Sequence, residues 1–228
     1  MSRPARALAA LIWGSLCGVI VLVAAVATWG LMSARAPLAG ASAPPAPTVL
    51  ETPEGLGTIP PFSLVDRTGE TVTLDDLRGR WWVADFIFTR CAGICPLLST
   101  RMSGLIQSIP HLERDDVRFV SFTVDPAHDT PDVLAHYASR YRVPAGAADM
   151  WMFLTGPRDV IQGLVHDGFR LTMLDNGPGA PPGEEEVTHS ERFVLVDPAG
   201  RIRGYYHGTD EDSVRRLAED LETLRKGS

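Results

Sequence analysis

The chain has 228 residues, of which 45% are hydrophobic and 21% charged, and it contains three cysteines. This length allows one domain with appendages or two small domains, and this composition excludes a disordered chain, a collagen and a coiled coil. Three cysteines are too few for a disulfide scaffold. The formal net charge is −7, which argues against a nucleic-acid partner because such proteins present a basic face.

The N-terminal segment has the pattern of a membrane anchor. Residues 7–32 form a run of 26 residues without a charge, which is long enough to cross a bilayer as one helix. Arg3 and Arg6 precede this run, and only Arg35 follows it closely. The positive-inside rule therefore places residues 1–6 in the cytoplasm and the rest of the chain outside. A cleaved signal peptide is the alternative, although its apolar region usually has only ~7–15 residues.

A tether follows the predicted anchor. Residues 36–61 contain seven prolines among Ala, Ser, Thr and Gly, and we interpret 33–57 as an extended, solvated linker. The globular domain is then expected over residues 58–228. No Arg/Ser-rich amphipathic presequence comes before the anchor, which favours a bacterial inner-membrane protein with a periplasmic domain.

Short strands open the globular domain. The alternating segments 62–66 and 71–74 flank the turn residues 67–70 and predict a hairpin. Residues 81–88, WWVADFIF, form a continuous apolar run interrupted only by Asp85. Such a run is typical of a strand that is buried on both faces of a sheet.

Buried strands and helices then alternate. The expected elements are a helix closed by Pro110, a strand over 117–124, a helix from Asp129 or Thr130 to about 141, a strand over 151–156 and a helix over 157–167. Strands that alternate with helices in this way predict a parallel sheet with helices on both of its faces.

The C-terminal part closes the sheet. A Gly/Pro-rich acidic loop over 175–187 is followed by the segments 192–197 and 201–206, which predict an antiparallel hairpin. A helix capped by Thr209 completes the chain. The whole order predicts an α/β fold, namely a thioredoxin-like sheet with flanking helices and extra N-terminal strands, preceded by one transmembrane helix.

Two cysteines lie between strand 81–88 and the next helix, in the segment TRCAGICP over 89–96. The carboxyl end of a parallel strand is where ligands bind in open α/β sheets. A helix N-terminus favours thiolate, so we expect lowered pKa values for Cys91 and Cys95. Their Cys-x-x-x-Cys spacing can place both sulfurs on one side of an exposed loop, where they could close a disulfide or hold one metal ion.

The chemistry of this pair has several interpretations. A purely structural disulfide is disfavoured because so small a loop constrains almost nothing. Zinc is an alternative, but a structural zinc site needs four protein ligands. In a thioredoxin-like sheet, the loop entering strand 192–197 lies beside the cysteines, and His189 occupies that loop. Two thiolates and one imidazole form a soft site of low coordination, which suits Cu(I). The remaining histidines are expected to be surface, packing or idle solvent-exposed residues, namely His111, His128, His136, His166 and His207.

Two acidic residues follow strand 117–124 at the same edge of the sheet. Asp129 is expected to cap the next helix, and that role alone would explain it. Asp125 is a candidate for supporting the cysteine site or for docking a partner.

Three segments together resemble the Sco/SenC family: FTRCAGICP, TVDPAHDTPDVLAHYASRY and THSERFVLVDPAGRIRGYYHG. The resemblance covers roughly residues 58–226. It implies a membrane-tethered thioredoxin-like domain that binds copper through Cys91, Cys95 and His189 and helps to assemble the dinuclear copper centre of cytochrome c oxidase. Asp125 and Asp129 match the family's DPxxDTP segment. Ala92 is a departure, because many relatives have proline there.

The resemblance implies two roles for the same residues. The first is a metallochaperone that carries copper, as Cu(I) or Cu(II), to an oxidase subunit or another copper protein. The alternative is a membrane-tethered thiol–disulfide reductase that uses Cys91 and Cys95 as its redox pair on a copper-protein partner. Peroxide reduction is disfavoured because no recognised peroxidatic Thr/Arg pocket is present.

Overall fold

In the computed structural model of the protein, the described residues are 56–109, 116–145, 147–172, 174–175, 187–188 and 190–227. They fall within one compact unit, Ala46–Ser228. None of the helices in these ranges is long and apolar enough to cross a membrane. The predicted cytoplasmic segment 1–6, the predicted anchor 7–32 and all but the last two residues of the predicted linker 33–57 lie outside the described residues.

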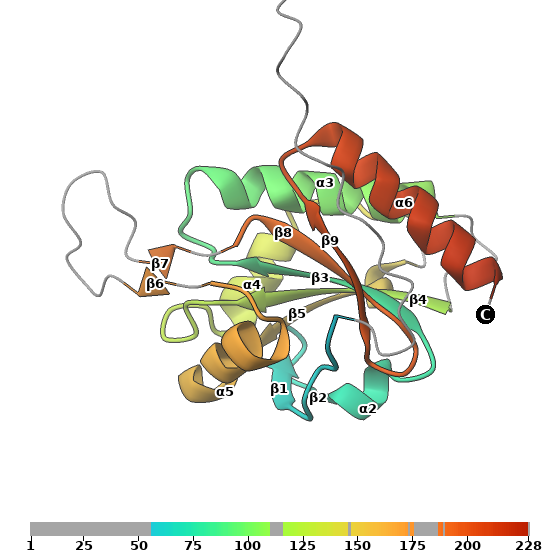
Figure 1. Ribbon diagram of the computed structural model, residues 1–228. Helices are drawn as coiled ribbons and strands as arrows, with labels where there is room; N and C mark the ends of the chain where they lie inside the picture. Colours follow the sequence, from blue (N-terminus) through green and yellow to red (C-terminus); the bar gives the residue numbers. More distant parts are fainter. Residues whose placement is uncertain are drawn as a thin grey trace, which may run out of the picture. The chain divides into compact units, whose positions relative to one another are not determined.

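A seven-stranded mixed sheet forms the centre of this unit (Figure 1). Its strands are β1 (Ser63–Asp66), β2 (Thr71–Thr73), β3 (Trp81–Ile87), β4 (Val117–Thr123), β5 (Trp151–Thr155), β8 (Arg192–Val196) and β9 (Ile202–His207). The spatial order is β2-β1-β5-β4-β3-β8-β9. The middle strands β3, β4 and β5 are parallel, and both predicted hairpins join their edges antiparallel. The predicted sheet with extra N-terminal strands is confirmed.

Helices cover both faces of the sheet. They are α2 (Leu74–Leu77), α3 (Ile94–Ser108), α4 (Pro131–Ala138), η2 (Ala148–Met150), α5 (Arg158–Gly163), the π-helical η3 (Leu164–Gly168) and α6 (Glu211–Lys226). Helices α3 and α6 lie on one face and α5 on the other (Figure 1). A hydrogen bond of 2.8 Å between the hydroxyls of Ser99 and Tyr137 places α4 beside α3.

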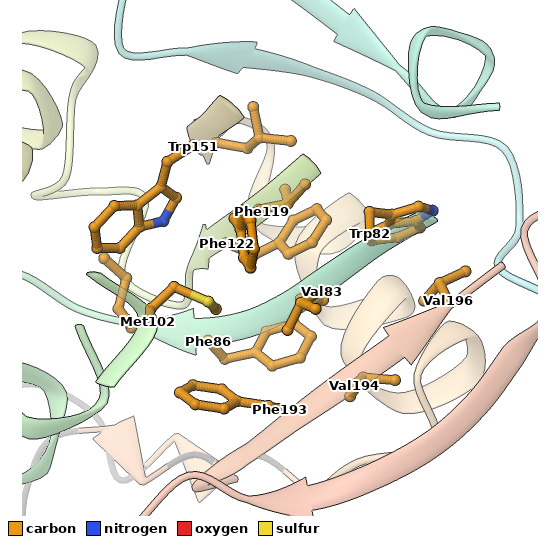
Figure 2. Close-up of a cluster of buried hydrophobic side chains, with 14 of the residues drawn as sticks. Trp82, Val83, Phe86, Met102, Phe119, Phe122, Trp151, Phe193, Val194 and Val196 are labelled. Atoms are coloured by element: carbon orange, nitrogen blue, oxygen red, sulfur yellow. The ribbon is translucent and has the colours of Figure 1, made fainter. Parts of the chain in front are cut away.

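The hydrophobic core is built around the central strands. All seven residues of β3 are buried, as expected for a strand covered on both faces. Figure 2 shows Phe86, Phe119 and Phe122 among the buried side chains of β3 and β4. The ring of Phe169, at the end of η3, lies 5.0 Å from that of Phe86 and 5.4 Å from that of Phe122. The even-numbered side chains of β3 therefore face α5 and η3, and the odd-numbered ones face α3.

Two local predictions need correction, and a third had two alternatives between which the structure decides. Leu74 begins helix α2 instead of ending a strand, because Thr73 and Asp76 form a capping box at this point. Helix α6 is capped by the side chain of Asp210, not by Thr209. Helix α4 begins with Thr130 as its N-cap, and the side chain of Thr130 accepts a hydrogen bond from the backbone of Val133.

The predicted acidic loop 175–187 has paired ends. The short strands β6 (Leu174–Asp175) and β7 (Val187–Thr188) form a separate two-stranded antiparallel sheet. The intervening residues 176–186 lie outside the described part of the chain.

Candidate metal centre

The turn between β3 and α3 brings the two predicted cysteines together. The backbone N–H of Cys95 donates to Sγ of Cys91 at 3.4 Å, and both residues are thiols. Gly93 is the N-cap of α3, so Cys95 lies in its first turn next to Pro96. Helix and strand thus meet at the carboxyl edge of the parallel strands, as the sequence pattern predicts.

Burial of the thiols differs from the prediction. Ala92 and Gly93 are exposed, but Cys91 is only 5% exposed and Cys95 is completely buried. The cysteines therefore point inward from the turn, and the expected exposed loop carries neither sulfur on its surface.

The pKa of Cys95 is also opposite to the prediction. Loss of solvation on burial raises the pKa of the Cys95 thiol, and nearby Cys91 and Asp85 raise it further. A hydrogen bond with the backbone of Phe88 acts in the other direction but is outweighed. The position of Cys95 at a helix N-terminus therefore does not compensate for removing its thiolate from water. A metal ion that bound Cys95 would have to displace the proton of this thiol.

Asp129 anchors the residue at the start of the cysteine turn. Its side chain is completely buried. One carboxylate oxygen, Oδ2, accepts hydrogen bonds from the backbone N–H of Thr89 at 3.1 Å and from the hydroxyl of Thr123 at 2.5 Å. The other, Oδ1, accepts from the Thr89 hydroxyl at 2.5 Å and lies 3.0 Å from Nδ1 of His128. Asp129 is thus an anchor for the turn and not the helix cap that the sequence suggested.

Asp125 holds the next residue of the turn. Its Oδ2 accepts hydrogen bonds from Nη2 of Arg90 at 2.7 Å and from Nε at 3.2 Å. The Asp125 side chain is 6% exposed and that of Arg90 is 47% exposed. Thr89 and Arg90 immediately precede Cys91, so the two aspartates fix the chain that leads into the site. Sequence reasoning missed Thr89 and Arg90, although their position beside Cys91 at a ligand-binding edge could have indicated them.

A hydrogen-bond network, and not a metal site, accounts for the acidic cluster. Among the described residues, one group of three His, Cys, Asp or Glu side chains has ligand atoms within 4.8 Å of one another, namely Asp125, His128 and Asp129. Both carboxylates already accept hydrogen bonds from Thr89, Arg90 and Thr123. His128 is therefore part of this network and not an idle surface residue.

Three of the remaining histidines lie among the described residues. His136, His166 and His207 are exposed, as expected. His111 and the predicted ligand His189 lie outside the described residues. Among the described residues that follow in the chain, β8 begins at Arg192 and pairs antiparallel with β3. The start of β8 thus lies at the end of β3 that leads to Cys91.

Comparisons with known proteins agree on one family. The SCO1/SenC family model matches residues 51–226. The SCO1 protein homolog of Bacillus subtilis is 33% identical over 166 residues, which are 72% of this chain and 81% of the relative. The solved structure of BsSco, a member of the Sco family of cytochrome c oxidase assembly proteins, has a TM-score of 0.61 and 33% identity, over 74% of this chain and 94% of that one. Yeast Sco1 with copper bound has a TM-score of 0.57 and 26% identity, over 73% and 89% of the two chains.

Proposed function

The chain belongs to the SCO1/SenC family, and we propose that it is a membrane-anchored copper chaperone that helps to assemble the dinuclear copper centre of cytochrome c oxidase. In this proposal copper is cargo, bound by the thiolates of Cys91 and Cys95 and by the imidazole of His189. The observation that carries the proposal is the convergence of two thiols in one rigid turn at the ligand-binding edge of the sheet.

The donor set suits copper. Two thiolates are soft ligands, which select Cu(I) over hard cations such as Mg²⁺ and Ca²⁺. No described His, Asp or Glu forms a group of three ligand atoms with the two thiols, so a third ligand is sought in the remainder of the chain. His189 is two residues from Glu191, which precedes β8, and β8 runs beside β3. This placement supports His189 as the third ligand.

The aspartates support the site without binding the metal. Asp129 holds Thr89 and Asp125 holds Arg90, so the residues before Cys91 cannot shift freely. A ligand turn fixed in this way keeps one geometry during loading and release. We therefore assign Asp125 and Asp129 to positioning of the turn, with Arg90 as an exposed cation beside it that an acidic partner surface could contact.

A second function uses the same two thiols. Cys91 and Cys95 are close enough for the backbone N–H of one to reach the sulfur of the other, so a membrane-tethered reductase of disulfides in a copper-protein partner is the alternative. In that case, thiolate attack on the partner disulfide and closure of a Cys91–Cys95 disulfide would transfer two electrons to the partner.

The proposed cellular setting follows the sequence pattern. Residues 7–32 would cross the bacterial inner membrane once, residues 1–6 would stay in the cytoplasm, and 33–57 would tether the domain 58–228 in the periplasm. Fusion of a periplasm-dependent reporter enzyme to the C-terminus should give an active reporter, and fusion after residue 6 an inactive one. The opposite pattern of reporter activity would contradict the proposed topology.

An anaerobic Cu(I) titration tests the copper site. The full-length reduced protein in detergent competes with a chelator of known affinity, beside His189→Ala and the matched variant His166→Ala, which alters an exposed histidine on η3. We expect one tight equivalent in the wild type and in His166→Ala. Loss of a residue that only hydrogen-bonds a metal ligand lowers metal affinity roughly 10–100-fold. His189→Ala removes a proposed ligand itself, so its Cu(I) affinity should fall by more than that. Unchanged affinity in His189→Ala would remove it from the site, and no tight copper at all would favour the reductase.

A further inference from the structure

Helices α3 and α6, which lie on one face of the sheet (Figure 1), enclose a groove between them. A hollow of about 480 Å³ lies towards the start of α6, and a second of about 230 Å³ lies towards its end. Three residues line both hollows and join them into one feature, which we call the α3/α6 groove: Ser108, Arg215 and Ala218. None of the described residues that line it belongs to the cysteine turn 89–96.

The α3/α6 groove has an apolar side chain at each end. Leu97, at the end near the cysteines, is 40% exposed and is the only exposed large hydrophobic residue in the described part of the chain. Ile109 lies at the other end and Val214 on α6, and both are half-buried. A single exposed leucine is ordinary on a protein surface, but this one belongs to a hollow that extends along two helices. The groove therefore presents apolar surface that a single chain leaves uncovered.

Gly104 lines the middle of the groove and has no explanation within a single chain. It is an exposed residue in the interior of α3, where glycine disfavours the helix. A Cβ at this position would contact nothing within 4 Å, so packing of the chain on itself does not require a glycine. Close approach by the backbone of another molecule would require one. The occupant of the groove should therefore come close to α3 at this point.

The charges that α6 places along the groove indicate which molecule fits it. From the cysteine end they are acidic, basic, acidic and basic: Glu211, Arg215, Glu219 with Glu222, and Arg225. The remaining charge of the lining, Arg101 of α3, lies 3.4 Å from Glu211 of its own chain. Reversing the order on α6 gives the opposite sign at every place. A second copy that runs antiparallel therefore sets each acid against a base, whereas a copy that runs in the same direction would face like charges.

Ion pairs within the chain leave the central charges available to a second copy. Arg215 lies 2.8 Å from Asp212 and 4.0 Å from Glu219, and Glu222 pairs with Lys226. All five side chains are more than half exposed, so each pair contributes little to stability. The guanidinium of Arg215 has five N–H donors, and it can accept another carboxylate without losing a strong interaction.

We propose that the α3/α6 groove is the contact surface of a symmetric dimer, and that its occupant is the same groove of a second copy of this chain. The two-fold axis crosses the groove at right angles, so that α6 packs antiparallel on α6 and α3 on α3. Arg215 of each chain then pairs with the acids Glu219 and Glu222 of the other. The two α3 helices approach each other near Gly104, and Leu97 of each chain is covered by the far end of the other groove.

This arrangement is self-complementary and closes at two copies. The two cysteine turns lie at opposite ends of the shared surface and outside it, so both stay open to a partner protein. The inference goes beyond the proposed function and does not depend on copper or thiol chemistry.

Two single charge reversals test the dimer. Full-length, reduced proteins in detergent are measured by light scattering corrected for bound detergent, which gives the mass of protein in each particle. The wild type should contain two chains. Arg215→Glu and Glu222→Arg each place like charges together at two symmetric points, so each should raise the dimer dissociation constant by about tenfold or more. An equimolar mixture of the two variants should regain the wild-type value, because the two reversed charges then face each other.

Two further variants separate the dimer contact from other effects. Arg158→Glu changes the net charge as Arg215→Glu does, but at an exposed residue of α5 on the opposite face of the sheet, and it should dimerise like the wild type. Gly104→Gln fills the groove and should weaken the dimer by about tenfold or more. Thermal unfolding of its dilute single chain should occur at an equal or higher temperature than in the wild type, because glycine is a poor helix former.

Three results would overturn the proposal. A wild type with one chain per particle at every concentration would leave the groove to a different kind of partner. Dimers that persist unchanged in Arg215→Glu, Glu222→Arg and Gly104→Gln would show association elsewhere, for instance through residues 1–57, which all variants share. A mixture of the two charge reversals that stays as single chains would contradict the antiparallel two-fold arrangement.

Discussion

Two completely buried aspartates lie near the same cysteine turn, yet their surroundings differ. Asp129 is surrounded by the donors Thr89 and Thr123 and by His128, whereas Asp85 has one donor and an oxygen without a described partner. Burial of a carboxylate is tolerated when hydrogen bonds replace its hydration, and it destabilises the charged form when they do not. The comparison separates a carboxylate that fixes the cysteine turn from one whose charged form is disfavoured by burial.

The largest effect is expected from Asp129→Ala. It leaves the hydroxyl of the buried Thr123 and the N–H and hydroxyl of the half-buried Thr89 without their acceptor, and each such loss costs up to about 1–3 kcal/mol. We expect the free energy of unfolding to fall by about 5 kcal/mol in chemical denaturation. Asp132→Ala, at the exposed first turn of α4, should lower it by less than about 1 kcal/mol. A similar small loss in both variants would contradict the anchoring role of Asp129.

Asp85→Asn should change the free energy of unfolding in the opposite direction to Asp129→Ala, by an amount that depends on pH. The folded-state pKa of Asp85 is raised from 3.8 to about 7, so the folded protein binds this proton more tightly than the unfolded chain. Its contribution to stability is fully present below pH 4 and is lost as the pH rises through about 7. The stability of Asp85→Asn relative to the wild type should therefore increase between these pH values, by on the order of 4 kcal/mol.

Chemical denaturation of both proteins at intervals from pH 4 to pH 8 would measure this difference. Titration of other groups cancels in the comparison, since the two chains differ at one residue. A difference that stays constant over the whole pH range would show that Asp85 does not change protonation in the folded protein there.

Sequence patterns predicted the position of the cysteines in the sheet better than they predicted the burial and the pKa of Cys95. The apolar run of β3 and the alternation after it were sufficient to place Cys91 and Cys95 at the carboxyl edge of a parallel sheet. Local reasoning about a helix N-terminus predicted a lowered pKa for both cysteines, but Cys95 is covered by the packing of the whole helix on the sheet. That burial depends on contacts between distant segments, which a local pattern does not contain.

The hydrogen-bond partners of individual side chains were equally hard to predict. A sequence with Asp129-Thr130-Pro131 offers two adjacent caps for α4, and only the path of the chain shows that Thr130 caps while Asp129 reaches back to Thr89. Helix α2 was missed, although the Thr73–Asp76 spacing of its capping box was visible in the sequence. The third ligand, His189, remains a prediction from the fold pattern and the family resemblance.

The smallest effect is expected for the half-exposed partner of Asp125. Arg90→Gln removes the cation from a carboxylate that is 6% exposed, and Gln can restore only part of the hydrogen bonding. We expect a loss of about 1–2 kcal/mol in the free energy of unfolding, because solvent screens the exposed half of the pair. Arg215→Gln is the matched control, since Arg215 pairs with Asp212 at 2.8 Å with both side chains more than half exposed.

A double-mutant cycle separates the pair from its surroundings. Combining Arg90→Gln with Asp125→Asn should cost less than the sum of the single changes by about 1 kcal/mol, whereas Arg215→Gln with Asp212→Asn should be additive within about 0.5 kcal/mol. Additivity at both pairs would mean that Arg90 contributes to the turn no more than a surface arginine does. Coupling only at Arg90 and Asp125 would add Asp125 to the comparison of Asp129 with Asp85. Asp125 is then a buried carboxylate that is stabilised by one ion pair with a half-exposed arginine.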